Sequence, residues 1–256
     1  MNKYLENARV VDFYGYKRYI FDYNGHEANV IVPHEQKSNY WVWRAEFLDC
    51  GFDWVDMDML RRGYALMYYR ICDMYGCPEA VELMDCFYRL MTEELGYAKK
   101  TTLFGFSRGG LYSANFALAY PERCASLYLD APVLDIKSWP GGLGVGLGAE
   151  REYKECLDWY RLDRSTVLAW KGNPTDRAAE LAANGTPMAI VVGDSDRDVP
   201  HRENAELVVA AYEAAGAEKA PLLYIVKPGC DHHPHSIPDP TPVSEFIEKY
   251  TVERNS

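Results

Sequence analysis

The sequence lacks the features that would place the chain in a membrane or in an export pathway. Its first residues, Met-Asn-Lys-Tyr-Leu-Glu-Asn, contain no apolar stretch of the kind found in signal peptides. It has no continuous apolar run of about 18 residues, the length that a membrane-spanning helix needs. Internal repeats and low-complexity tracts are also absent. We therefore expect a globular, cytoplasmic protein with no membrane partner.

Basic residues are scarce. Lysine and arginine number 27 against 38 aspartates and glutamates, so the net charge is −11, and no basic stripe reverses this locally. A polyanion such as DNA or RNA would be repelled by this field, which excludes a nucleic-acid partner. The partner that remains is a small-molecule substrate.

The seven cysteines show no metal-site spacing. Cys72 and Cys77 are not followed by a second pair at the interval typical of zinc sites. Most of the cysteines stand in apolar or helical stretches, which is typical of buried free thiols in a reducing compartment. We expect neither disulfides nor a metal, and no cofactor.

Short β-like runs alternate with longer helix-like runs along the chain, which predicts an α/β fold with a mostly parallel twisted sheet flanked by helices. The predicted strands are 17–23, 28–32, 64–70, 101–106, 125–129, 187–192 and 222–226. The predicted helices are 52–62, 78–95, 111–120, 203–215 and 242–250. Residues 1–256 form one predicted domain. The alternation breaks at about 133–183, which we interpret as a small cap inserted over one end of the sheet.

A serine stands at a predicted strand-to-helix turn. The segment 101–110 contains Gly105-x-Ser107-x-Gly109 between an apolar strand and a helix. A nucleophile on such a turn sits in a strained backbone conformation that exposes its hydroxyl, and glycines two residues on either side avoid collisions. A chance match in a structural turn is the alternative reading. The strand and helix context favours a nucleophile elbow.

Acidic and imidazole side chains follow two later predicted strands. Asp194, Asp196 and Asp198 come after the strand that ends near residue 192, and histidines 232, 233 and 235 come after the last strand. A loop carboxylate can orient a histidine, and imidazole can take and return a serine proton near neutral pH. These residues also suggest a metal site, but the irregular spacing and Pro234 argue against one.

Together the motifs resemble the α/β-hydrolase superfamily, over about residues 14–250. They are Gly105-Phe-Ser-Arg-Gly-Gly110, Gly193-Asp-Ser-Asp-Arg-Asp-Val-Pro200 and Pro228-Gly-Cys-Asp-His232. Within it, the chain is similar to bacterial esterase-like and prolyl-oligopeptidase-like single-domain members. The resemblance implies a Ser107–Asp196–His232 catalytic triad, with Asp194 and His233 as the second choices.

The resemblance also implies an oxyanion hole formed by two backbone N–H groups. One donor should be Arg108, the residue after the nucleophile. The other should come from a loop after an early strand. Counting back from Trp43-Arg44, a pair common in the family, places it near Gln36, with Trp41 as the alternative.

The function implied is hydrolysis of a small carboxylic ester through an acyl-enzyme, and an acylated carbohydrate or aryl ester would suit it. Trp41, Tyr75 and Trp139 are the predicted substrate-binding residues, because aromatic side chains often line such pockets. Core packing is the alternative role for each. Two other functions remain open: a peptidase or amidase using the same triad, and a catalytically silent ligand-binding protein.

Overall fold

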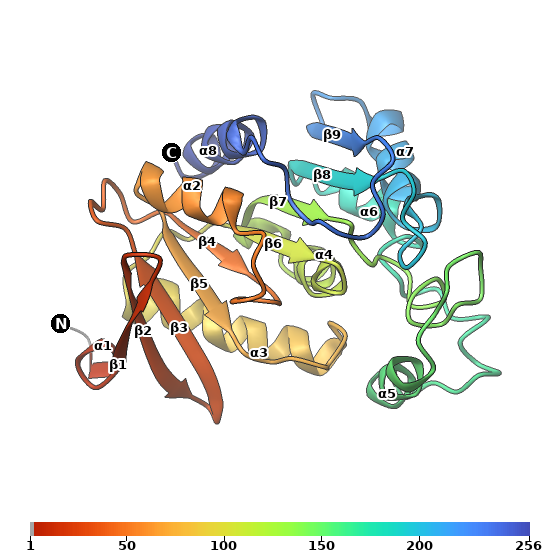
Figure 1. Cartoon of the computed structure of the whole chain (residues 1–256), viewed down its shortest axis with the longest axis horizontal. Coiled ribbons are helices and arrows are strands. Elements are labelled where there is room, and N and C mark those ends of the chain that lie inside the picture. Colours follow the sequence, from red (N-terminus) through yellow and green to blue (C-terminus); the bar gives the residue numbers. More distant parts are fainter. Residues whose placement is uncertain (1–2) are drawn as a thin grey trace.

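The computed structural model describes residues 3–256 (Figure 1). Nine strands form one sheet in the order β1-β2-β3-β5-β4-β6-β7-β8-β9. The strands are β1 (Arg9–Phe13), β2 (Tyr16–Tyr23), β3 (His26–Val32), β4 (Trp41–Arg44), β5 (Ala65–Tyr69), β6 (Thr101–Phe106), β7 (Cys124–Asp130), β8 (Met188–Gly193) and β9 (Leu222–Lys227). The pairs β1–β2, β2–β3 and β3–β5 are antiparallel, and the other neighbouring pairs in this order are parallel. The predicted α/β class with a mostly parallel sheet is confirmed.

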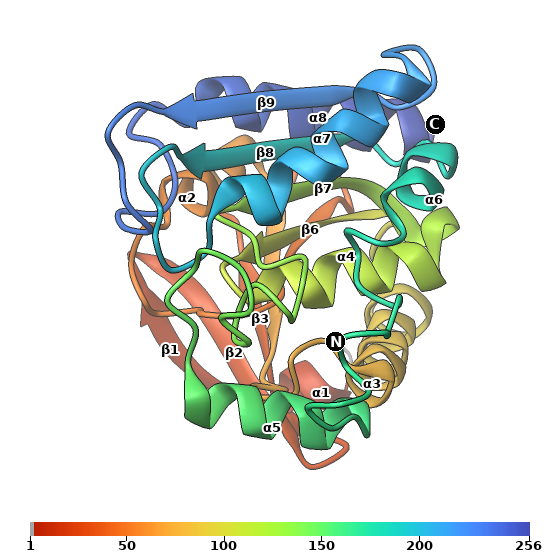
Figure 2. The same cartoon turned by 90° about the vertical axis from the view of Figure 1, so that its right-hand side faces the viewer.

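Helices cover both faces of the sheet. They are α1 (Lys3–Glu6), α2 (Trp54–Arg62), α3 (Pro78–Arg89), α4 (Gly109–Ala119), α5 (Glu150–Tyr160), α6 (Ala178–Ala183), α7 (Ala205–Ala215) and α8 (Thr241–Asn255). A π-helical turn, Leu90–Glu94, extends α3. Helices α2 and α8 pack on one face, and α3, α4, α6 and α7 lie on the other (Figure 2). The carboxyl ends of the parallel strands therefore lie together along one side of the sheet, open between the two helical layers.

Local sequence explains where two of these elements end. Asn24 and Gly25 both have positive φ (53° and 79°), as a tight turn between β2 and β3 requires. Gly63 ends α2 in the left-handed conformation with φ 95°, which glycine adopts without steric cost.

Strands β1 and β4 were not predicted, and β4 changes the position of the site. Its four residues are fully buried between β5 and β6, and the Trp41 indole N–H donates to the Ala98 carbonyl at 2.8 Å. Strand β3 runs antiparallel to β5, so the loop 33–40 lies where the parallel strands begin. A Cβ on Gly63, just before β5, would be 3.0 Å from the Glu35 carbonyl oxygen, which places this loop at that edge.

The stretch from residue 131 to 177 is mostly irregular and includes α5, which lies apart from the sheet (Figure 1). Helix α6, within the predicted cap 133–183, packs on α4 and α7 and so belongs to the helical layer of the main body. The irregular part of the cap therefore ends before α6.

All seven cysteines, each within the described residues, carry free thiols. Among residues 3–256, none of the helices combines the length and the apolar character needed to cross a lipid bilayer.

Candidate active site

Ser107 occupies the sharp turn between β6 and α4. Its φ of +49° is strained for a non-glycine residue, as a nucleophile elbow requires. Its N–H donates to the Asp130 carbonyl, and its own carbonyl accepts the Val133 N–H, both at 2.9 Å. These bonds fix the turn against the end of β7.

Two glycines make this turn possible, and one of them is not the glycine that the motif indicates. A Cβ on Gly105 would come within 2.8 Å of the Gly109 carbonyl oxygen. A Cβ on Gly110 would come within 2.7 Å of Pro132. At Gly109 the closest contact would be an ordinary 3.4 Å. Steric crowding therefore requires glycine at 105 and 110 rather than at 105 and 109.

The structure brings the three predicted triad residues together. Ser107 Oγ lies 3.0 Å from His232 Nε2, and His232 Nδ1 lies 2.7 Å from Asp196 Oδ2. The three residues follow β6, β8 and β9, three strands that end at the same edge of the sheet. This arrangement can transfer a proton from the serine to an imidazole that a carboxylate holds in place.

Of the three aspartates after β8, the structure places one against the histidine. Asp196 is buried, and its Oδ1 accepts the N–H groups of Asp198 and Val199 at 3.0 and 2.8 Å. Asp194 is exposed, and its Oδ1 accepts the Gly229 N–H at 2.7 Å instead. Asp198 is exposed as well. Geometry therefore favours Asp196 over the second choice, Asp194.

The histidine loop also separates its candidates. His232 is buried and touches both Ser107 and Asp196, whereas His233 is exposed and stacks against Phe52, with 5.8 Å between the ring centroids. The pKa of His233 is lowered by partial burial and by the neighbouring imidazoles of His235 and His232. Of these two histidines, only His232 has the contacts of a general base.

Asp231, the residue before His232, links the acid loop to the histidine loop. Its Oδ1 accepts the N–H of Arg197 at 3.1 Å and that of His232 at 2.9 Å, and its Oδ2 accepts from the Arg197 guanidinium. These two backbone N–H groups, together with the guanidinium, lower the pKa of Asp231. The carboxylate therefore holds the two loops in register.

The predicted second oxyanion donor, Gln36, is wrong. Gln36 is exposed on the loop 33–40, at the opposite edge of the sheet from Ser107. The alternative, Trp41, lies inside β4 and is fully buried. The loop that reaches the site follows β4 instead, since a Cβ on Gly109 would lie 3.7 Å from the Glu46 nitrogen. The prediction failed because the four-residue strand β4 was taken for part of a loop.

Arg44, the last residue of β4, fixes this loop. Its buried guanidinium donates to the carbonyls of Glu46 (3.1 Å) and Phe47 (3.3 Å) and to Asp56 Oδ2 (2.6 Å). It also lies 3.7 Å above the centre of the Phe106 ring. Orienting the two carbonyls also orients the peptide groups of the loop that faces Ser107.

Arg108 connects the elbow to the same loop. Its guanidinium donates to Glu46 Oε2 at 2.7 Å and pairs with Asp73 at 2.7 Å. Burial alone would lower the pKa of Arg108, but the two carboxylates outweigh it and raise the pKa. Within residues 3–256, the backbone N–H groups of Arg108, Glu46 and Phe47 find no hydrogen-bond acceptor. These amides remain available to a negatively charged oxygen.

Known proteins share this architecture. Residues 71–146 match a family model described as the alpha/beta hydrolase fold. The puromycin-hydrolyzing peptidase of Mycobacterium tuberculosis aligns over 98% of this chain and 39% of its own, with 14% identity and a TM-score of 0.65. Dipeptidyl peptidase 4 of Porphyromonas gingivalis aligns over 93% and 35%, with 16% identity and a TM-score of 0.64. The S-formylglutathione hydrolase of Agrobacterium tumefaciens aligns over 96% and 97%, with 15% identity and a TM-score of 0.55.

This chain has the α/β-hydrolase fold. The predicted resemblance to that superfamily, to its peptidases as well as its esterases, is confirmed. The chain spans little more than a third of the length of the two peptidases, and nearly the whole of the S-formylglutathione hydrolase. No curated protein sequence matches it.

The hydrolase-fold chain has a cavity of about 260 Å³ at Ser107. Its lining is mainly apolar and aromatic: Arg44, Phe47, Cys50, Gly51, Phe52, Phe106, Ser107, His232, His233 and His235. The aromatic walls therefore come from the loop after β4 and from the end of β6, and sequence reasoning missed them.

None of the three predicted substrate-binding aromatics lines this cavity. Trp41 is buried in β4, where its indole holds the Ala98 carbonyl. Tyr75 is fully buried and donates to Glu155 at 3.0 Å. Trp139 packs near Tyr75, at 6.3 Å between ring centroids. Trp41 therefore belongs to the core of the sheet, while Tyr75 and Trp139 pack where the stretch 131–177 meets the main body, so the alternative of core packing applies to all three.

Proposed function

We propose that the chain is a serine hydrolase that cleaves a small carboxylic ester through an acyl-enzyme. The observation that carries the proposal is the hydrogen-bonded chain Asp196–His232–Ser107, whose serine opens into a small apolar cavity. The buried carboxylate and the strained serine are the arrangement that acyl transfer uses.

In the proposed mechanism, His232 Nε2 takes the Ser107 proton while Oγ attacks the ester carbonyl. Asp196 accepts the Nδ1 hydrogen, which fixes the tautomer and stabilises the imidazolium. His232 then gives the proton to the departing alcohol. Water, activated by the same imidazole, hydrolyses the acyl-enzyme and restores the serine.

The oxyanion of each tetrahedral intermediate would be bound by the Arg108 N–H and by an N–H of the loop after β4, from Glu46 or Phe47. The Arg108–Glu46 ion pair and the Arg44 hydrogen bonds hold both donors in place before substrate arrives. One such donor is typically worth about 2.7–4 kcal/mol in the transition state.

The dimensions of the cavity indicate the substrate. Sites for drug-sized ligands measure about 300–1,000 Å³. The 260 Å³ found here, with phenyl groups from Phe47, Phe52 and Phe106, suits a short acyl chain or one aromatic ring. The predicted aromatic walls do not line the site, so the case for a sugar is weaker than that for a short-chain aryl ester.

Peptide or amide hydrolysis is the second candidate. It is supported by the two peptidases, whose TM-scores of 0.65 and 0.64 exceed the 0.55 of the esterase. The same triad serves both reactions, so only turnover can distinguish them. We favour esters because the chain aligns with the whole of the esterase but with about a third of each peptidase.

The test compares Ser107→Ala with Ser195→Ala, a change at an exposed serine of the acid loop. We expect p-nitrophenyl acetate hydrolysis and fluorophosphonate labelling in the wild type and in Ser195→Ala, and neither in Ser107→Ala. Short aryl esters should be turned over faster than aminoacyl p-nitroanilides. Labelling of folded Ser107→Ala would contradict the serine mechanism, and an unlabelled wild type would favour a silent binding protein.

A further inference from the structure

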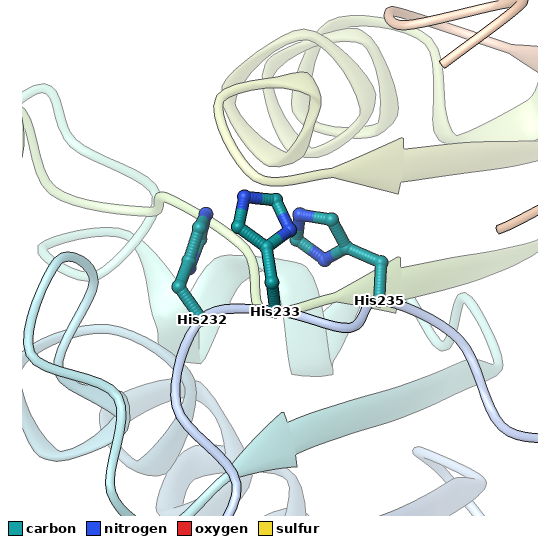
Figure 3. A group of neighbouring side chains, drawn as sticks. All are labelled: His232, His233 and His235. Carbon is teal, nitrogen blue, oxygen red and sulfur yellow. The ribbon is translucent and has the colours of Figure 1, made fainter. Parts of the chain in front are cut away.

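Three imidazoles meet beside the candidate nucleophile. One ring nitrogen each of His232, His233 and His235 lies within 4.8 Å of the others. Figure 3 shows the three rings side by side on the loop that follows β9. The spacing of these residues and the presence of Pro234 predicted no metal site. The folded loop nevertheless places the rings edge to face, with centroids 4.8–5.1 Å apart.

Buried carboxylates hold two of the three rings. His232 Nδ1 lies 2.7 Å from Asp196 Oδ2, and His235 Nδ1 lies 2.8 Å from Asp130 Oδ1. Asp130 is itself held by the Ser236 N–H, at 2.8 Å from Oδ2. A carboxylate on Nδ1 leaves Nε2 as the ligand atom and is the usual outer-shell partner of a zinc-bound histidine. The triad accounts for the first pair but not for His235 and Asp130.

The geometry is close to that of an open three-histidine zinc site. Zn–N bonds of about 2.0–2.1 Å in a tetrahedral site put the ligand nitrogens about 3.3 Å apart. The three ring nitrogens lie within 4.8 Å of one another, so each pair would have to approach by at most about 1.5 Å. His233 is exposed and no carboxylate holds its ring, so it can adjust more readily than the two buried rings that Asp196 and Asp130 hold. The exposed side leaves the fourth position open to water.

We propose that His232, His233 and His235 bind one Zn²⁺-like cation, and that this ion reversibly switches the hydrolase off. The metal would occupy the Nε2 lone pair of His232, the atom that must accept the Ser107 proton. Asp196 and Asp130, which are hydrogen-bonded to the ligands His232 and His235, would offset the positive charge of the ion. Loss of activity on binding rests on the proposed serine mechanism, whereas binding itself does not.

The first experiment measures binding without catalysis. An untagged chain carrying Ser107→Ala and Cys50→Ser is titrated with Co²⁺, and absorbance in the visible range reports tetrahedral coordination. Cys50 is replaced because its thiol also lines the cavity. We expect one Co²⁺ per chain, displaced by Zn²⁺. Adding His233→Gln or His235→Gln should abolish the absorbance, while His201→Gln, at a histidine outside the cluster, should not change it.

Asp130→Asn tests the outer shell. Loss of such a carboxylate typically weakens metal binding by about 10–100-fold, and we expect that loss in Co²⁺ affinity with the folded state verified by circular dichroism. The proposal is overturned if the Ser107→Ala chain binds no Co²⁺, or if the His233→Gln, His235→Gln double variant still binds it.

The second experiment measures turnover of p-nitrophenyl acetate by the otherwise wild-type Cys50→Ser chain. Zn²⁺ should inhibit it with a stoichiometry of one, and EDTA should restore it. The inhibitory concentration, measured against the zinc-free rate of each variant, should rise by at least about tenfold in His233→Gln. Undiminished turnover at saturating Zn²⁺ refutes the switch. If no ester or amide is hydrolysed, the proposed function fails, while the Co²⁺ result still decides the metal site.

Discussion

Replacing Asp196 by asparagine tests the choice of catalytic acid with little change in shape. Asp196 Oδ2 accepts the Nδ1 hydrogen of His232, and Oδ1 accepts two backbone N–H groups. An asparagine can keep the backbone bonds through its carbonyl oxygen but presents an NH₂ group to Nδ1. The imidazole then carries its hydrogen on Nε2, facing Ser107, and cannot take the serine proton.

The expected loss in kcat is about 10⁴-fold, the size typical of a triad left in the wrong tautomer. This corresponds to about 5.4 kcal/mol of transition-state stabilisation. The assay is steady-state hydrolysis of p-nitrophenyl acetate, with unfolding in urea measured in parallel. Asp194→Asn is the matched control, because Asp194 is exposed and bonds to Gly229 rather than to a histidine. Equal losses in the two variants, or an Asp196→Asn enzyme within tenfold of wild type, would refute the reasoning.

Three more changes probe the supports of the site. Arg44→Lys keeps the charge beside Asp56 but loses hydrogen bonds to the loop after β4, so kcat should fall by up to about 10²-fold. Gln36→Ala, in the loop at the other end of the strands, should leave kcat unchanged. The same kcat in both variants would contradict the assignment of the loop after β4 to the site. Gly105→Ala forces a Cβ against backbone and should cost about 1–3 kcal/mol in urea unfolding, so an unchanged midpoint would dismiss the crowding. Asp85→Asn tests pH dependence. Burial raises the pKa of Asp85, but the guanidinium groups of Arg89 and Arg123 lower it by a larger amount. The pKa of Asp85 in the folded protein therefore lies below the unfolded value of about 3.9. Its stabilising effect should be full above that pH and disappear as pH falls through the folded pKa, so the difference from wild type should shrink between about pH 6 and pH 3.

The triad could be predicted because each member stands in a local sequence context with a physical meaning. A serine between an apolar strand and a helix, and polar loops directly after two later strands, place three side chains at one edge of a parallel sheet. The choice of Asp196 and His232 within their clusters needed the family resemblance, since neighbouring loop residues share the same composition. The structure separates them by burial and contact.

The loop after β4, which we propose as the oxyanion loop, could not be found in this way because β4 carries little strand signal. Its sequence, Trp-Val-Trp-Arg, is only four residues long and buried on both faces, so it shows no alternation. Its last residue is an arginine, which does not suggest a buried strand, because the sequence alone does not show that Asp56 neutralises its charge. Without β4, the preceding loop was taken for the one at the site. The aromatic walls at Phe47 and Phe52 were missed with it.

The meeting of His233 and His235 with His232 depends on how a loop folds, which no periodicity encodes. Histidines at helical spacing would face the same side of a helix and could be expected to bind one metal together. Pro234 excludes a helix here, so the sequence did not predict that these histidines meet. The deciding contact is with Asp130, more than a hundred residues earlier in the chain.

Among residues 3–256, strand β9, which supplies the histidine loop, is an edge strand of the sheet that pairs with β8 alone and is half-buried along most of its length. Edge elements with few buried contacts open locally at a lower free energy than the core that they border. Each such opening would carry His232 away from Ser107 while β6 and its elbow stay folded. On heating, the chain should therefore lose its chemistry before its fold, and turnover would report fraying of one strand rather than melting of the whole molecule.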